Sequence, residues 1–305
     1  MNTYSWQQLL GIIALSAALV GLPVLGMAAD SDQDGITDAL ETSGLTFPPG
    51  GFPYPPCAAG TVQGSVARNA CLSTTSKDIF VYLVTAAGGG FLAQNGLINM
   101  ATNPVDASVL FQFITAPNTA TTTGKVDGLG VGVHVAVVNA APAPASLAVG
   151  DLGQKAVVVT VDEAASAYAF GHTDVGPPTN TGISTIWPVY VKTYLNKYVF
   201  GGIDKPGDTN IPSCTTCGWK AYIQRTAAHE LSHAAALTAA YNSSLGQYHY
   251  ATGSGTVMDD AVVCTSNRGG SCKIYNDYAN GDRPCLLSLV SPTTNPLQCL
   301  AGIIQ

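Results

Sequence analysis

Charged residues are scarce in this chain: only 10% of its 305 residues are Asp, Glu, Lys or Arg, and Lys and Arg together number 12. The net charge is −7 and no block of basic residues occurs, so we expect neither nucleic acid nor anionic lipid as a partner. Residues 1–29 carry no charged side chain and end in small residues, which is typical of a signal peptide. The alternative is a retained membrane anchor, the one form in which we expect the protein to meet a membrane.

Cysteines are few but even in number, since the chain has 8 of them. Together with the leader, they predict disulfides in a secreted or cell-surface protein. Proximity in the sequence suggests the pairs Cys57–Cys71, Cys214–Cys217, Cys264–Cys272 and Cys285–Cys299, although many other pairings are open. Cys214 and Cys217 are alternatively half of a zinc site, but the chain has no second C-x-x-C to complete it.

An acidic segment follows the leader. Residues 30–41 carry acidic side chains at positions 1, 3, 5, 9 and 12 and Gly at position 6, which is the spacing of an EF-hand calcium loop. The expected calcium ligands are Asp30, Asp32, Asp34, the backbone carbonyl of Ile36, Asp38 and a bidentate Glu41. The segment resembles the Asp-rich loops of thrombospondin type 3 and dockerin modules. The alternative is a solvated acidic terminus.

Apolar and β-branched runs predict a set of strands and helices. The expected strands are 78–85, 109–115, 130–138 and 155–161. The expected helices are 92–101, 184–200 and 219–241, and the expected loops are 43–75, 172–181 and 201–218. His134 should therefore lie in a strand and His172 in a solvated loop. This order of elements predicts an α+β fold, with an upper lobe built on a mixed β-sheet over about 75–241 and an irregular, disulfide-rich lower lobe over about 242–305.

The expected long helix carries an H-E-x-x-H motif made by His229, Glu230 and His233. Histidines at i and i+4 lie on one face of a helix, so both can bind one metal ion, and the Glu can take a proton from a metal-bound water. The chain has only five His and three Glu, which makes an accidental match rare. The alternative is a surface helix that happens to carry two His.

The motif resembles that of the zincin peptidases, and the third ligand divides these into subclasses. No Glu follows Glu230, so a thermolysin-like site is excluded, and the Gly and nearby His of the strict metzincin motif are also missing. His249, nine residues before Met258, resembles the third His and the Met-turn of matrixin-like sites, with an insertion between the second and third ligands. Residues 255–259 also resemble the G-T-x-x-D of the aspzincins, which makes Asp259 the rival third ligand.

This resemblance implies a metzincin-like catalytic domain over residues 46–305, following the leader 1–29 and the calcium loop 30–45. It implies a secreted zinc endopeptidase that acts on protein or peptide substrates, with zinc held by His229, His233 and His249 and a zinc-bound water activated by Glu230. Tyr248 and Tyr250 flank His249 and are candidate donors to an oxyanion. The alternative function is a non-enzymatic surface or matrix protein with a calcium-stabilised N-terminus and a degenerate metal site.

Overall fold

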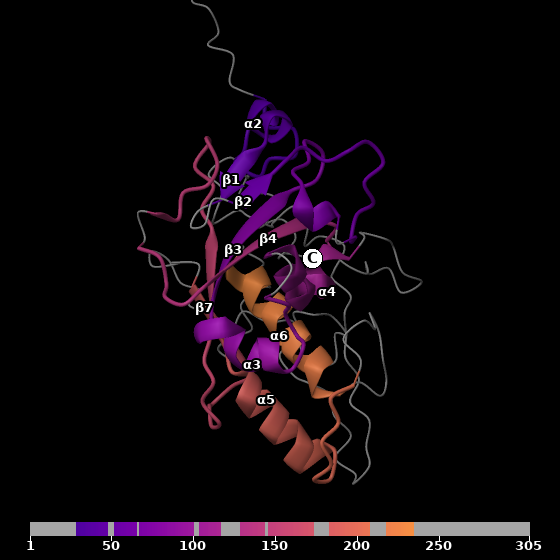
Figure 1. Ribbon diagram of the computed structural model, residues 1–305, viewed down its shortest axis with the longest axis vertical. Coiled ribbons are helices and arrows are strands. Elements are labelled where there is room, and N and C mark those ends of the chain that lie inside the picture. The colour runs from indigo at the N-terminus through magenta and orange to yellow at the C-terminus, as the bar shows by residue number, and fades with distance from the viewer. Residues whose placement is uncertain are drawn as a thin grey trace, which may run out of the picture.

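The computed structural model describes residues 29–47, 52–65, 67–100, 104–116, 129–143, 146–173, 183–207 and 218–234. These residues form a mixed α/β fold with a mostly parallel five-stranded sheet and a small antiparallel hairpin (Figure 1). We expected an α+β fold with a mixed sheet, whereas the described sheet is mostly parallel, with helical segments between the strands at 78–84 and 132–138. No described helix is both long and apolar enough to span a bilayer. Residues 1–28 of the predicted leader 1–29 and the predicted lower lobe lie outside the described residues.

The central sheet has the strand order β4-β3-β5-β7-β6. Strands β3 (Asp78–Val84), β4 (Gly132–Val138), β5 (Val157–Val161) and β7 (Ile183–Ile186) pair in parallel, and the short edge strand β6 (Gly171–Thr173) runs antiparallel to β7. The predicted strands at 78–85, 130–138 and 155–161 are thus confirmed. Their Val-rich runs suit parallel strands, which are covered on both faces.

Alternate residues of β3 enter two different cores. Ile79 and Val81 point to the face covered by helix α6 (Trp219–Ala234), where they pack with its apolar side chains. Phe80 and Tyr82 point to the opposite face. There they meet Phe47 of the hairpin β1 (Leu45–Phe47) and β2 (Phe52–Tyr54), with ring centroids 5.0 and 4.7 Å apart. The N-terminal segment and the motif helix therefore cover opposite faces of one sheet.

The remaining elements are short. They are α2 (Asp38–Ser43), η1 (Arg68–Ala70), η2 (Ala87–Gly89), α3 (Gly90–Gln94), η3 (Pro104–Phe111), α4 (Gln112–Thr115), α5 (Pro188–Tyr194) and the π-helix η5 (Leu195–Val199). In Figure 1, α2 and the hairpin lie at one end of the described part of the molecule and α5 at the other, with α6 between the strands β3 and β4 and α5.

The strand predicted at 109–115 is wrong, because this segment is helical and belongs to η3 and α4. Leu110, Phe111, Phe113 and Ile114 are each at most 1% exposed, while Val109 and Gln112 are half-buried. The periodicity of so short an apolar run does not distinguish a strand from a helix.

The helix predicted over 184–200 is wrong at its start, since residues 183–186 form β7 and the helix α5 begins at Pro188. Proline fits the first turn of a helix, where its missing N–H costs nothing. Two predicted loops also contain strands. Residues 171–173 form β6, although His172 is exposed as expected, and the hairpin β1–β2 lies within 43–75. The short helix predicted over 92–101 instead spans Gly90–Gln94.

Candidate metal centres

The H-E-x-x-H motif lies on α6, as predicted, and near the end of the described part of this helix. All residues of α6 except Lys220 are buried. Trp219 fixes its start, because its indole Nε1–H donates to Asp204 Oδ1 at 2.8 Å. A helix buried on every side is held by the core rather than by a solvated face, so its side chains are placed rigidly against the sheet.

The two histidines of the motif converge on one point. The Nε2 atoms of His229 and His233 lie 3.1 Å apart, and the side chains are only 7% and 4% exposed. Two nitrogens that each bind one tetrahedral zinc at about 2.0–2.1 Å would be about 3.3 Å apart. The pair therefore fits two adjacent corners of a zinc site.

Glu230 lies between the two histidines in the sequence and packs under the edge of the sheet. Burial raises its pKa to about 8, although a hydrogen bond from Thr173 and the charge of Arg225 oppose this rise. Thr173 Oγ1 donates to Glu230 Oε2 at 2.6 Å. A carboxyl group whose pKa lies near neutrality can both accept and return a proton at physiological pH.

Three residues around Glu230 were missed by the sequence analysis. Thr173 and Gly171 come from β6, and Ser184 comes from β7. The hydroxyl of Ser184 donates to the backbone oxygen of Glu230 at 3.1 Å. Thr173 and Glu230 are 57 residues apart in the chain, and neither β6 residue belongs to a recognisable motif. Only the fold brings them together.

The remaining predicted site residues near the zinc motif lie outside the described residues. These are His249, Asp259, Met258, Tyr248 and Tyr250, together with the six cysteines from Cys214 onward.

The start of the acidic loop forms a tight turn around the Asp30 carboxylate. Asp30 accepts the backbone N–H groups of Asp34 and Gly35 at 3.2 and 3.1 Å. Gly35 has a φ of 92°, a conformation that favours glycine. Carboxylate oxygens of Asp30, Asp32 and Asp34 lie within 4.8 Å of one another.

Four buried carboxylate oxygens in this loop lack a hydrogen-bond donor among the residues that the structure describes. They are both side-chain oxygens of Asp32 and both of Glu41. Burial, and then the charges of nearby carboxylates, raise the pKa of Asp32 to about 7 and that of Glu41 to about 9. Buried carboxylates without donors are costly unless a cation compensates them, and calcium binds such hard oxygen ligands.

Two predicted calcium ligands, Asp38 and Glu41, have other neighbours than the loop spacing implied. Asp38 accepts from both the backbone N–H and the hydroxyl of Ser31, at 2.8 and 2.7 Å, and it does not join the carboxylate groups. Glu41 groups with Asp34 and with Asp78, the first residue of β3, rather than with all of the loop aspartates. Ile36 is fully buried, and its N–H donates to Asp34 Oδ1 at 2.9 Å.

The loop is joined to the sheet at several points rather than forming a separate module. Lys77 Nζ donates to the backbone carbonyls of Asp32 and Gln33 at 2.5 and 2.6 Å. Thr37, which caps α2, donates to Asp151 from both its backbone N–H and its hydroxyl. The predicted calcium segment and the sheet are therefore parts of one packed unit.

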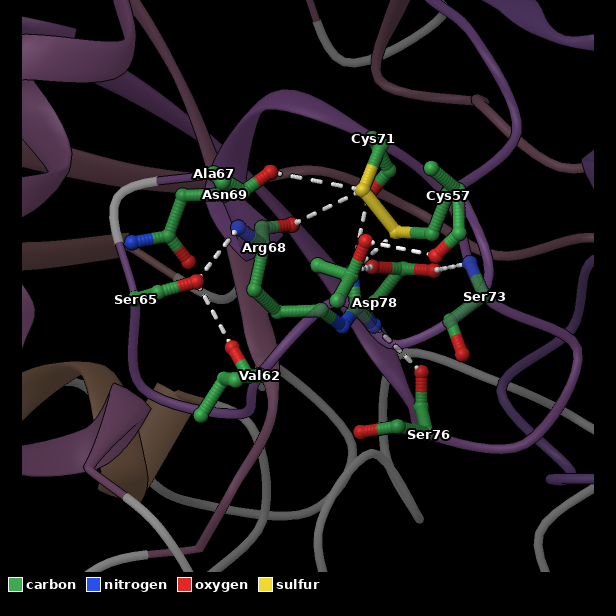
Figure 2. Close-up of a disulfide and its surroundings, with 12 residues drawn as sticks. Cys57, Val62, Ser65, Ala67, Arg68, Asn69, Cys71, Ser73, Ser76 and Asp78 are labelled. Atoms are coloured by element: carbon green, nitrogen blue, oxygen red, sulfur yellow. Dashed lines mark hydrogen bonds and ion pairs between the residues drawn. A yellow bond between two sulfur atoms is a disulfide. The ribbon is translucent and has the colours of Figure 1, made fainter.

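A buried polar cluster of Arg68, Asp78 and His134 lies next to this loop. The disulfide Cys57–Cys71, a pairing that the sequence suggested, lies beside Arg68 and Asp78 (Figure 2). Asp78 Oδ1 lies 2.7 Å from both Arg68 Nη1 and His134 Nε2. Arg68 also donates to the backbone oxygens of Cys71 and Ser76 at 2.7 and 2.6 Å. Burial disfavours the Asp78 anion, but Arg68 and His134 hold its pKa below the ordinary value. His134 is a strand residue, as predicted, and its partner Asp78 explains how it is accommodated among valines.

No protein-family model, no curated protein and no solved structure matches this chain. The functional reading therefore depends on the residues themselves.

Proposed function

We propose that this chain is a zinc-dependent endopeptidase that is secreted or displayed at the cell surface. The observation that carries the proposal is the 3.1 Å approach of the His229 and His233 Nε2 atoms on a buried helix that also holds Glu230 against the sheet edge. A structural metal site has no need of a general base, whereas hydrolysis requires one at this position.

His229 and His233 would hold the zinc, and His249 would complete the ligand set, with Asp259 as its rival. Bound zinc would supply Lewis acidity toward the scissile carbonyl and toward a water molecule. Glu230 takes the proton of the attacking water and delivers it to the leaving amine.

The substrate would be an extended polypeptide paired with β6. Within the described sheet, β6 is an edge strand, with a strand partner only on its β7 side. An extended peptide can add to such an edge through main-chain hydrogen bonds. Because Gly171 and Thr173 of β6 contact Glu230, a peptide on this edge would lie next to the proposed base.

The metzincin-like class remains part of this proposal. It would assign Met258 to a turn beneath the metal and Tyr248 or Tyr250 to the oxyanion. The disulfide Cys57–Cys71 supports export, since such bonds persist in oxidising compartments.

We also propose that the acidic loop binds calcium. The four buried oxygens of Asp32 and Glu41 that have no donor in the described structure support this, together with the loop geometry around Asp30 and Gly35. The ion would be structural, since the loop packs on the face of the sheet opposite α6.

The zinc content of purified protein tests the main proposal. We expect one zinc per chain in protein prepared without chelator, and its loss in His229→Gln and His233→Gln. His172→Gln is the matched control, because His172 is exposed and lies outside the motif. A wild-type protein that contains no zinc and takes up none when it is added would overturn the proposal.

A further inference from the structure

Two hydroxyl groups from neighbouring strands meet the motif glutamate. Thr173 Oγ1 lies 2.6 Å from Glu230 Oε2 and 2.8 Å from Ser184 Oγ, and Ser184 Oγ lies 3.1 Å from the backbone oxygen of Glu230. Each hydroxyl has one hydrogen. The hydrogen of Thr173 goes to the carboxylate, the closest acceptor, and that of Ser184 goes to the Glu230 carbonyl.

The register of the sheet creates this arrangement. Thr173 on β6 is paired with Ser184 on β7, so both side chains project from the same face, toward α6. Both are almost completely buried, at 5% and 0% exposure. The hydroxyl pair thus fixes the side chain and the backbone of Glu230 at the same time.

Gly171 accommodates the rest of the Glu230 side chain. A Cβ atom at this position would lie 2.5 Å from Glu230 Oε1 and 2.6 Å from its Cγ, so any other residue would displace the carboxylate. One carboxylate oxygen is therefore held by Thr173, and the other lies over the bare backbone of the edge strand.

We propose that Thr173 is a positioning residue that orients Glu230 for proton transfer. Its hydroxyl occupies Oε2 and, with Gly171 against Oε1, fixes the plane of the carboxylate that would accept the proton of the attacking water. This inference rests on the proposed peptidase function and assigns a role within it to a residue outside the zinc motif. Groups that orient a catalytic or ligating side chain in this way are commonly worth about 10–100-fold in activity.

The test compares Thr173→Val, which keeps the shape but removes the hydroxyl, with Thr173→Ser, which keeps the hydroxyl. Each is assayed for peptide cleavage, zinc content and thermal stability. We expect Thr173→Val to lower kcat by about 10–100-fold with KM nearly unchanged, because an oriented base matters only in the transition state. Thr173→Ser should restore most of the activity. Thr185→Val is the matched control, since Thr185 is the next residue after Ser184 on β7 and points to the opposite face.

A second readout does not depend on turnover. A peptide hydroxamic acid must give up a proton as it binds zinc, and Glu230 is the nearby acceptor. Its affinity, measured by calorimetry on zinc-loaded protein, should fall in Thr173→Val and recover in Thr173→Ser. If Thr173→Val does not fold, Thr173→Ala takes its place in the same comparison.

The inference is overturned if the zinc-loaded Val or Ala variant keeps the wild-type kcat and hydroxamate affinity, or if Thr173→Ser is as impaired as they are. A wild-type protein that neither binds zinc nor cleaves peptide would instead overturn the proposed function, and this assignment with it.

Discussion

The carboxylate of Asp34 accepts the backbone N–H of Asp78 at 2.7 Å, which joins the acidic loop to the first residue of the first parallel strand. The side chain of Asp78 in turn binds Arg68 and His134. An ion bound in the loop would therefore stabilise the sheet as well as the N-terminal segment, because both belong to the same packed unit.

Calcium should raise the thermal stability of metal-stripped protein to which only zinc has been restored. At a calcium concentration of about 100 times Kd, binding stabilises the native state by about 2.7 kcal/mol, which corresponds to about 4–5 °C in Tm for a chain of this size. Calorimetric scans with and without calcium measure this. A Tm that millimolar calcium does not move would mean that residues 30–41 are only an acidic segment.

Glu41→Gln and Asp38→Asn should differ in their effect on calcium affinity. Glu41 is buried, and both of its carboxylate oxygens lack a hydrogen-bond donor in the described structure. The Asp38 carboxylate, in contrast, accepts two hydrogen bonds from Ser31. We expect Glu41→Gln to weaken calcium binding strongly and Asp38→Asn to have a much smaller effect. Titration calorimetry on the two variants measures the difference, and equal losses would restore Asp38 to the ligand set predicted from the loop spacing.

The calcium effect should increase with pH. The pKa values of Asp32 and Glu41, about 7 and about 9, lie above their ordinary values of 3.8 and 4.5. The calcium-free native state therefore keeps protons that the unfolded chain releases, so it loses stability as pH rises from about 5 to about 9. Calcium replaces these protons, so the gain in Tm on adding calcium should widen across this range. Melting curves at pH 5, 7 and 9 check this, and a constant gain would contradict it.

Arg68→Met should destabilise the protein far more than Lys192→Met. The Arg68–Asp78 pair is buried, at 2% and 0% exposure, so the variant leaves a buried carboxylate without its guanidinium partner, at a cost of about 3–5 kcal/mol. The Lys192–Asp204 pair spans 3.4 Å at the surface and should contribute about 1 kcal/mol or less. Denaturant unfolding of both variants measures the difference, and similar losses would argue against a stabilising role for the buried cluster.

The features that the sequence predicts well are those with local signals. The H-E-x-x-H spacing needs only a helix to bring His229 and His233 together, and the valine runs of β3 to β5 need only a buried sheet. The Asp-rich spacing likewise predicts the turn at Gly35.

The features that could not be predicted depend on contacts between distant segments. Thr173 reaches Glu230 only because β6 pairs with β7 and α6 packs beneath both. Asp78 and His134 are 56 residues apart and meet through the pairing of β3 with β4. A three-residue edge strand such as β6 is also too short to show a periodicity.

The most direct test of the central claim is cleavage of reduced casein by wild type, Glu230→Gln and Glu163→Gln. The Gln at position 230 keeps the shape of the side chain and can still accept from Thr173, but it cannot serve as a base. Glu163, an exposed glutamate outside the motif, provides the matched control. We predict that zinc-loaded, folded Glu230→Gln loses activity by about 10²–10⁴-fold while Glu163→Gln matches wild type. Wild-type rates in Glu230→Gln, or no cleavage by wild type with zinc bound, would contradict the account.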